Sequence, residues 1–176
     1  MTQAADYCAA ETLRSGRKVE IRSLRPEDRE NLLAAAKDPN AQSLRRRFFT
    51  PKREFTEAEQ FFFTNVDFVN HVALIAILIE GGQPTIAGGG RYIIAGSGQA
   101  EIAFAVADKH QGQGIGSALL RHLVVIARAA GLRELVAEVL RENLAMLSVL
   151  KGSGLPQQAN YEAGTISLVL QLSRKK

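Results

Sequence analysis

Two kinds of hydrophobic pattern alternate along this chain. In the first, apolar residues alternate with polar ones or form a short continuous run, which predicts β-strands. The apolar run at residues 71–79 is expected to be a strand buried on both faces. The predicted strands are residues 19–24, 71–79, 84–94, 101–107, 135–140 and 166–172.

The second pattern has apolar residues at helical spacing, flanked by helix start and stop signals. Pro26 followed by Asp28 and Glu30 suits a first helical turn, and Gly131 suits a helix end. The predicted helices are residues 26–38, 41–49, a segment after Thr56 that carries Phe61, Phe62 and Phe63, residues 115–130, and residues 142–151.

The order of these elements predicts an α+β fold. Three strands follow one another through turns at residues 81–82 and 96–98, and so form a three-strand meander. Helices and strands then alternate, which predicts a mixed sheet with helices packed on it. Residues 1–17 show no clean period and are expected to be a flexible leader, whereas residues 18–176 are expected to form a single domain.

Composition narrows the class of protein. Hydrophobic residues make up 46% of the chain, which is enough for a core, and no apolar run reaches the roughly 18 residues of a transmembrane helix. The N-terminus carries Asp6 and Glu11 and lacks the apolar region of a secretory signal. The single cysteine, Cys8, favours a reducing compartment, so we expect a cytoplasmic protein that binds no membrane.

The charged and metal-binding residue types point to neither nucleic acid nor a metal. The net charge is only +4, and its one internal cluster, Arg45-Arg46-Arg47, is interpreted as the solvated end of a helix. A patch for an anionic ligand or a protein partner is the alternative. His71, His110 and His122 lack metal-ligand spacing, so no metal site is predicted.

A glycine-rich loop, His-Gln-Gly-Gln-Gly-Ile-Gly at residues 110–116, joins a predicted strand to a predicted helix. Glycines lack the Cβ that would keep a ligand away from the backbone. The N–H groups at the start of the helix and the helix dipole favour negative charge there. The loop therefore predicts a phosphate-binding site, with a glycine turn that holds no ligand as the alternative.

Two nucleotide-binding motifs fit this loop poorly. A P-loop requires a lysine after the glycines, and a dinucleotide-binding loop requires Gly-x-Gly-x-x-Gly in an early βαβ unit. This loop has neither feature and follows a meander. The pattern Gln/Arg-x-x-Gly-x-Gly/Ala remains, and it is met by Gln111, Gly114 and Gly116.

With that loop, the chain resembles the GNAT superfamily of acyl-CoA-dependent N-acetyltransferases. Residues 104–106 are similar to the fourth strand of the family, and Asn143 with Gly154 and Leu155 is similar to its later Asn…Gly-Phe segment. The resemblance covers nearly the whole chain. It implies the GNAT fold, which has a mixed, mostly antiparallel central sheet with helices on both faces.

Four further segments resemble the bacterial protein lysine acetyltransferases that are often fused to acyl-CoA-synthetase-like or regulatory domains. We expect the 176 residues to leave no room for such a fused domain. The segments are residues 24–28, 47–49, 67–74 and 137–140.

The resemblance implies acetyl-CoA as co-substrate, with no metal. Backbone N–H groups of the loop would hold the pyrophosphate, and the pantetheine arm would bond the strand near Phe104 and Val106, where an N–H would polarise the thioester. Asn143 would bond the CoA arm, or would only cap its helix. The predicted cofactor-binding residues are Phe104, Val106, Gln111, Gly112, Gln113, Gly114, Ile115, Gly116, Ser117 and Asn143.

An amine acceptor must lose a proton before it can attack, because a lysine with a pKa of about 10.4 is charged at neutral pH. Glu101 is the predicted base, since its apolar strand neighbours should raise its pKa and similar enzymes place a base there. A solvated glutamate is the alternative, and Glu138 is the second candidate. Leu150 stands where many members have a tyrosine acid, so water would protonate the thiolate.

We therefore expect an enzyme that transfers an acetyl group directly from acetyl-CoA to an amine. The expected acceptor is a lysine side chain of a protein such as an acyl-CoA synthetase. A small-molecule amine is one alternative. A CoA-sensing module without turnover is another, and it would bind acetyl-CoA without depending on Glu101.

Overall fold

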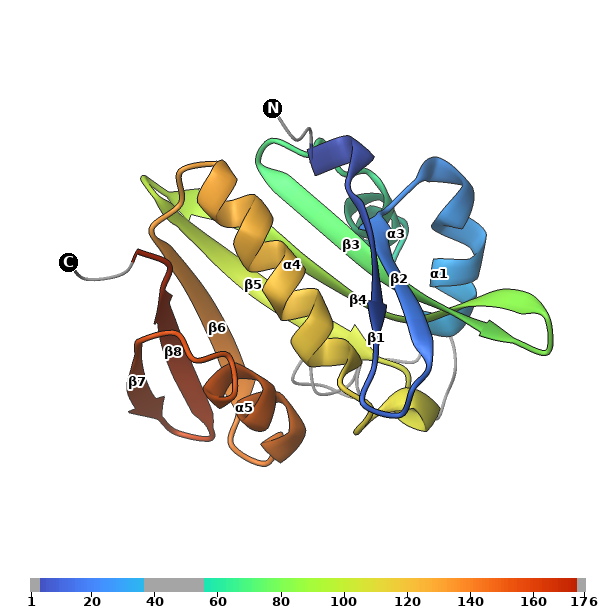
Figure 1. Cartoon of the computed structure of the whole chain (residues 1–176). Helices are drawn as coiled ribbons and strands as arrows, with labels where there is room; N and C mark the ends of the chain where they lie inside the picture. The colour runs from blue at the N-terminus through green and yellow to red at the C-terminus, as the bar shows by residue number, and fades with distance from the viewer. Residues whose placement is uncertain (1–3, 37–55, 174–176) are drawn as a thin grey trace.

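The computed structural model describes residues 4–36 and 56–173, which form one sheet covered by helices (Figure 1). The predicted helix at residues 41–49 and the arginine cluster within it lie outside the described residues. The helices are α1 (Arg29–Ala36), α3 (Glu57–Thr64), α4 (Ile115–Ala129) and α5 (Leu144–Lys151), and the 3-10 turns are Ala4–Asp6, Pro26–Asp28 and Asp108–His110. The strands are β1 (Cys8–Thr12), β2 (Lys18–Ser23), β3 (His71–Glu80), β4 (Gln83–Gly96), β5 (Gln99–Val106), β6 (Glu134–Leu140), β7 (Gln157–Glu162) and β8 (Thr165–Gln171).

The sheet has the strand order β1-β2-β3-β4-β5-β6-β8-β7. Every neighbouring pair is antiparallel except β5 and β6, which are parallel. The predicted meander is β3-β4-β5, and its short turns make these strands antiparallel neighbours. The prediction of a mixed, mostly antiparallel sheet is therefore confirmed.

Side chains of β3 alternate between two hydrophobic clusters, one on each face of the sheet. Leu74 lies in the main core together with residues of α4, whereas Ala73 and Ile75 lie in a smaller cluster with Leu32 of α1. Alternation along a strand sends neighbouring residues to opposite faces. In Figure 1, α4 crosses one face and α1 and α3 lie on the other, so the helices cover both faces as expected.

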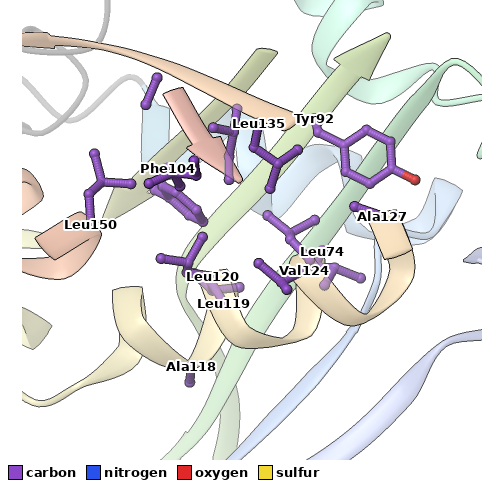
Figure 2. Close-up of a cluster of buried hydrophobic side chains, with 14 of the residues drawn as sticks. Leu74, Tyr92, Phe104, Ala118, Leu119, Leu120, Val124, Ala127, Leu135 and Leu150 are labelled. Atoms are coloured by element: carbon purple, nitrogen blue, oxygen red, sulfur yellow. The ribbon is translucent and has the colours of Figure 1, made fainter. Parts of the chain in front are cut away.

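The main core fixes the position of β5 against α4 and α5. Figure 2 shows Phe104 of β5 among Leu119, Leu120 and Leu150, all of them buried. The ring of Phe104 also lies so close to β4 that a Cβ on Gly90 would stand 2.7 Å from it. Gly90 therefore makes room for the side chain that anchors the middle of β5.

The prediction of a flexible leader is wrong for residues 4–12. β1 pairs with β2 from Cys8 opposite Arg22 to Thr12 opposite Lys18. The chain is also tied to α4, because Nε2 of His122 lies 2.8 Å from a carboxylate oxygen of Glu11. β1 is an edge strand with no buried residue, so it lacks the hydrophobic period by which strands are predicted.

Candidate active site

Backbone geometry prepares the glycine loop for an anion. Gly112 and Gly114 have φ values of +75° and +91°, in the left-handed region that favours glycine. A Cβ on either residue would meet no atom within 4 Å, so the space beside the loop is open. Two glycines in this conformation turn successive N–H groups toward the same side, which makes an anion-binding concavity.

The first turn of α4 adds further unpaired donors to this concavity. The helix makes its first backbone hydrogen bond from Ala118 N–H to the Gly114 carbonyl, at 3.0 Å. The N–H groups of Ile115, Gly116 and Ser117 therefore have no acceptor within the helix. Ile115 is buried and holds this turn against the core. Together with the helix dipole, these donors suit an anionic group such as a phosphate.

Gln111 differs from its predicted role. Its backbone N–H donates to the Asp108 carbonyl at 3.3 Å, and its side-chain amide donates to the Val106 carbonyl and to Asp108 Oδ1, both at 3.1 Å. The 3-10 turn at Asp108–His110 brings Gln111 back toward these partners, and motif spacing alone does not reveal that turn. Gln111 thus braces the loop against the end of β5, and the free N–H groups begin at Gly112.

The sheet opens beside this loop, between β5 and β6. Their parallel pairing covers only three positions and ends at Glu101 opposite Val136. Ala107 N–H donates to the Ala87 carbonyl on the β4 side, at 2.8 Å. Because backbone groups alternate along a strand, the N–H groups of Val106 and Phe104 point the other way, into the opening. An extended ligand such as a pantetheine arm can bond to the strand edge there.

Glu101 and Glu138 lie on one face of the sheet, on either side of this opening. Ala100 and Ile102 of β5 and Ala137 and Val139 of β6 face the core under α4. Glu101 and Glu138 each lie between two of these residues and so face the opposite side. Both glutamates are exposed. Two carboxylates on either side of this opening can attract a cationic amine and accept its proton.

The expectation that apolar neighbours desolvate Glu101 is wrong for the free chain. Ile102 and Phe104, which are close to it in the sequence, point to the other face and do not cover it. Water therefore reaches the carboxylate. Any desolvation of Glu101 must come from the bound acceptor or from parts of the chain outside the described residues.

A buried His–Arg pair lies on the same face as Glu101. Arg91 stands opposite Ala103 of β5, and its Nη1 lies 3.0 Å from Nε2 of His71 on β3. A guanidinium can only donate, so Nε2 of His71 accepts and the imidazole is neutral. The ring of Phe62 stacks on His71 with 5.0 Å between centroids. Arg91 was not among the predicted site residues, although a charged residue between Gly90 and Tyr92 in a buried strand was the available signal.

A carboxylate fixes the loop that carries His71 into the sheet. Asp67 Oδ1 accepts hydrogen bonds from the N–H groups of Val69, Asn70 and His71, at 2.8–2.9 Å. These bonds favour the charged form, so they lower the pKa of Asp67 below its usual value. This turn holds the start of β3, and hence His71 and Arg91, in place.

Asn143 caps α5, and Leu150 lies deep in the core. The Asn143 side-chain oxygen accepts a hydrogen bond from Met146 N–H at 3.2 Å, which is the capping role considered as an alternative. The amide donors of Asn143 remain suited to a ligand. Leu150 is fully buried and carries no proton to give, so a role as general acid at that position is absent. α4 and α5 approach closely at Gly116, where a Cβ would lie 3.3 Å from Val149.

A cluster of charged and titratable side chains, Arg17, Glu80, Lys109 and His110, lies beside the glycine loop. Glu80, at the end of β3, lies 3.0 Å from Lys109 Nζ and 3.7 Å from Arg17 Nη2. His110 is 2% exposed, and neither of its ring nitrogens makes a hydrogen bond, although Nε2 stands 3.1 Å from Glu80 Oε1. Burial lowers the pKa of His110 despite the nearby carboxylate, so its imidazole is neutral at pH 7.

Acid is therefore expected to destabilise the folded chain through His110. The unfolded chain takes up the proton near its ordinary pKa of about 6.5, whereas the folded chain resists it until a lower pH. The stability that this residue contributes is fully present above the ordinary pKa of about 6.5, and it is lost as the pH falls from there toward the lower pKa of the folded chain. Urea unfolding at about pH 7.5 and about pH 5.5 should show a smaller loss for His110→Phe than for the wild type. An equal loss in both proteins would contradict this assignment.

Two observations bear on metals and membranes. Within residues 4–36 and 56–173, no group of three or more His, Cys, Asp or Glu side chains is arranged to hold a metal ion. Over the same residues, no helix combines the length and the apolar character needed to cross a bilayer.

Comparison with known proteins identifies the family of the chain. Residues 38–155 match the model of the acetyltransferase (GNAT) family. The chain is 30% identical to acetyltransferase Pat of Mycolicibacterium smegmatis over 144 residues, which cover 81% of this chain and 42% of Pat. It is 31% identical to acetyltransferase PA5475 of Pseudomonas aeruginosa over 156 residues, which cover 88% of this chain and 84% of that protein. The chain thus spans less than half the length of Pat.

Solved structures agree with the fold. The GNAT domain of S. lividans PAT superposes with a TM-score of 0.82 at 34% identity, covering 93% of this chain and 96% of that domain. The putative acetyltransferase yncA of Salmonella typhimurium, solved with acetyl-CoA, has a TM-score of 0.66 at 18% identity. The match covers 89% of this chain and 95% of that chain. The second similarity shows the fold alone, and the first confirms the predicted GNAT architecture.

Proposed function

Because the chain belongs to the acetyltransferase (GNAT) family, we propose that it moves an acetyl group from acetyl-CoA directly to the side-chain amine of a protein lysine. The choice of acceptor class rests on the resemblance of residues 24–28, 47–49, 67–74 and 137–140 to bacterial protein lysine acetyltransferases, and the similarity to the GNAT domain of PAT is consistent with it. The exposure of Glu101 and Glu138 supports it, since in the described part of the chain both carboxylates are open to a large partner. A protein of the acyl-CoA synthetase class, in the cytoplasm, is the acceptor that we propose.

Cofactor binding would rest on the backbone of two elements. The N–H groups from Gly112 to Ser117 would hold the pyrophosphate, with Gln113 in the middle of the loop. The N–H groups of Phe104 and Val106 would bond the arm of the cofactor in the opening between β5 and β6. Asn143 would donate from its amide at the far side of that opening. When bound, acetyl-CoA supplies the activated acetyl carbonyl.

The chain's own residues would then handle the proton and the charge. Glu101 would accept the proton of the lysine ammonium, directly or through water, so that the neutral nitrogen can attack the acetyl carbon. A backbone N–H of β5 would stabilise the negative charge that develops on the carbonyl oxygen. The nitrogen loses its second proton to water as the carbon–sulfur bond breaks, and the thiolate takes a proton from water, because Leu150 offers none.

Turnover against a mixed panel of acceptors tests this function. Acetyl-CoA would be incubated with acyl-CoA synthetases, other proteins and small amines, and the products read by mass spectrometry. A single acetylated lysine in a synthetase is the expected result. Transfer to small amines alone would show that the acceptor class is wrong. Saturable acetyl-CoA binding without any transfer would favour the CoA-sensing module.

A further inference from the structure

Arg17 touches the glycine loop from outside it. Its Nη1 donates to Oε1 of Gln113 at 3.2 Å, although the two residues are 96 positions apart. Gln113 stands between Gly112 and Gly114, the two residues whose left-handed conformation shapes the loop. Arg17 follows the turn between β1 and β2, so this hairpin lies beside the loop (Figure 1). The guanidinium therefore reaches the rim of the proposed pyrophosphate site.

The cluster around Arg17 carries an excess of positive charge. Arg17 and Lys109 are both cations, and Glu80 is the carboxylate that lies between them. His110, the other titratable group packed against Glu80, is buried and neutral at pH 7. One positive charge of the four groups is thus not compensated within the cluster.

Both cations have capacity for a further partner. The side chains of Arg17 and Lys109 are 36% and 64% exposed. A guanidinium has five N–H donors. In the described contacts, Arg17 gives one to Gln113 and lies 3.7 Å from Glu80, which is longer than a hydrogen bond. Glu80 holds Arg17 and Lys109 near the loop and leaves N–H donors of both side chains available for another ligand.

We propose that Arg17, assisted by Lys109, binds the 3′-phosphate of coenzyme A. This phosphate is a monoester on the same ribose that carries the pyrophosphate, so it lies one sugar away from the glycine loop. A phosphate monoester has a charge of about −1.5 to −2 at pH 7, and a guanidinium pairs with it through two parallel hydrogen bonds. The proposal rests on the proposed cofactor site, and it assigns the hairpin a part in selecting CoA over its dephosphorylated form.

The test compares two ligands, acetyl-CoA and acetyl-3′-dephospho-CoA, by titration calorimetry. The wild type is expected to bind acetyl-CoA about 10- to 100-fold more tightly, as charge-assisted hydrogen bonds allow. Arg17→Gln should weaken acetyl-CoA binding by about that factor and leave the affinity for the dephospho ligand unchanged. Arg14→Gln is the matched control, since Arg14 is an exposed arginine of the same turn. It should bind both ligands as the wild type does.

Three results would overturn the proposal. Equal affinity of the wild type for the two ligands would show that no group recognises the 3′-phosphate. Equal weakening of both ligands by Arg17→Gln would show that Arg17 only supports Gln113 and the loop. If the wild type binds neither ligand, the cofactor site itself fails, and this outcome is distinct from tight acetyl-CoA binding without a preference. Thermal melting of each variant checks that the chain is folded.

Discussion

Replacement of Glu101 by glutamine is expected to lower kcat for acetyl transfer by about 10²–10⁴-fold, the usual contribution of a general base. Glutamine has nearly the same shape as glutamate but cannot accept the ammonium proton. Glu101 is exposed, so the change leaves the core intact. The acetyl-CoA affinity and the melting temperature should therefore stay at wild-type values, while steady-state rates with the lysine acceptor fall.

Glu138→Gln provides the matched control for this prediction. Glu138 is exposed on the same face of the sheet, and it lies on β6, across the opening from Glu101. Its loss should raise KM for a cationic acceptor more than it lowers kcat. A larger fall in kcat for Glu138→Gln than for Glu101→Gln would exchange the two roles. Unchanged rates in both variants would exclude Glu101 and Glu138 as the base.

Gly114→Ala is expected to weaken acetyl-CoA binding by roughly 10- to 100-fold, the equivalent of one charge-assisted hydrogen bond. Gly114 has φ of +91°, and the position of its missing Cβ is open space in the free chain. A methyl group there would occupy the space that the phosphate needs. It would also strain the backbone, at a cost of about 1–2 kcal/mol in unfolding free energy.

Gly131→Ala is the control that separates the effect of backbone strain from the effect of the lost phosphate contact in Gly114→Ala. Gly131 has φ of +79° at the other end of α4, and a Cβ there would also meet no atom within 4 Å. Both variants should lose a similar free energy of unfolding in urea titrations. Only Gly114→Ala should lose affinity for acetyl-CoA. An equal loss of affinity in both variants would mean that destabilisation, and not the loop, determines binding.

The elements that face the core were predictable from sequence, and those at the edges of the sheet were not. β3 and α4 were predicted at residues 71–79 and 115–130 and are found at His71–Glu80 and Ile115–Ala129. Both have strong hydrophobic periods, because one or both of their faces are buried. β1 and β7 were missed, since neither buries a side chain, and pairing along the backbone leaves no trace in the pattern of side chains.

The features of the candidate site also divide into those that could be predicted from sequence and those that could not. The glycine loop was predictable because its conformation and its donors are properties of adjacent residues. The surroundings of Glu101 were not, because they depend on which way a strand faces after the sheet has formed. The contact between Arg17 and Gln113 depends on the fold bringing distant segments together, and no local pattern reports it.

The opening between β5 and β6 would let one strand serve two ligands in perpendicular directions. Main-chain groups of Phe104 and Val106 lie in the plane of the sheet, whereas the Glu101 side chain stands out of that plane. If the donor molecule binds in the plane and the acceptor approaches from above, their reacting atoms meet along a single strand. Side chains on the acceptor face can then change without altering the groups that recognise the donor. Such a division allows one backbone to keep its donor while the range of acceptors diversifies.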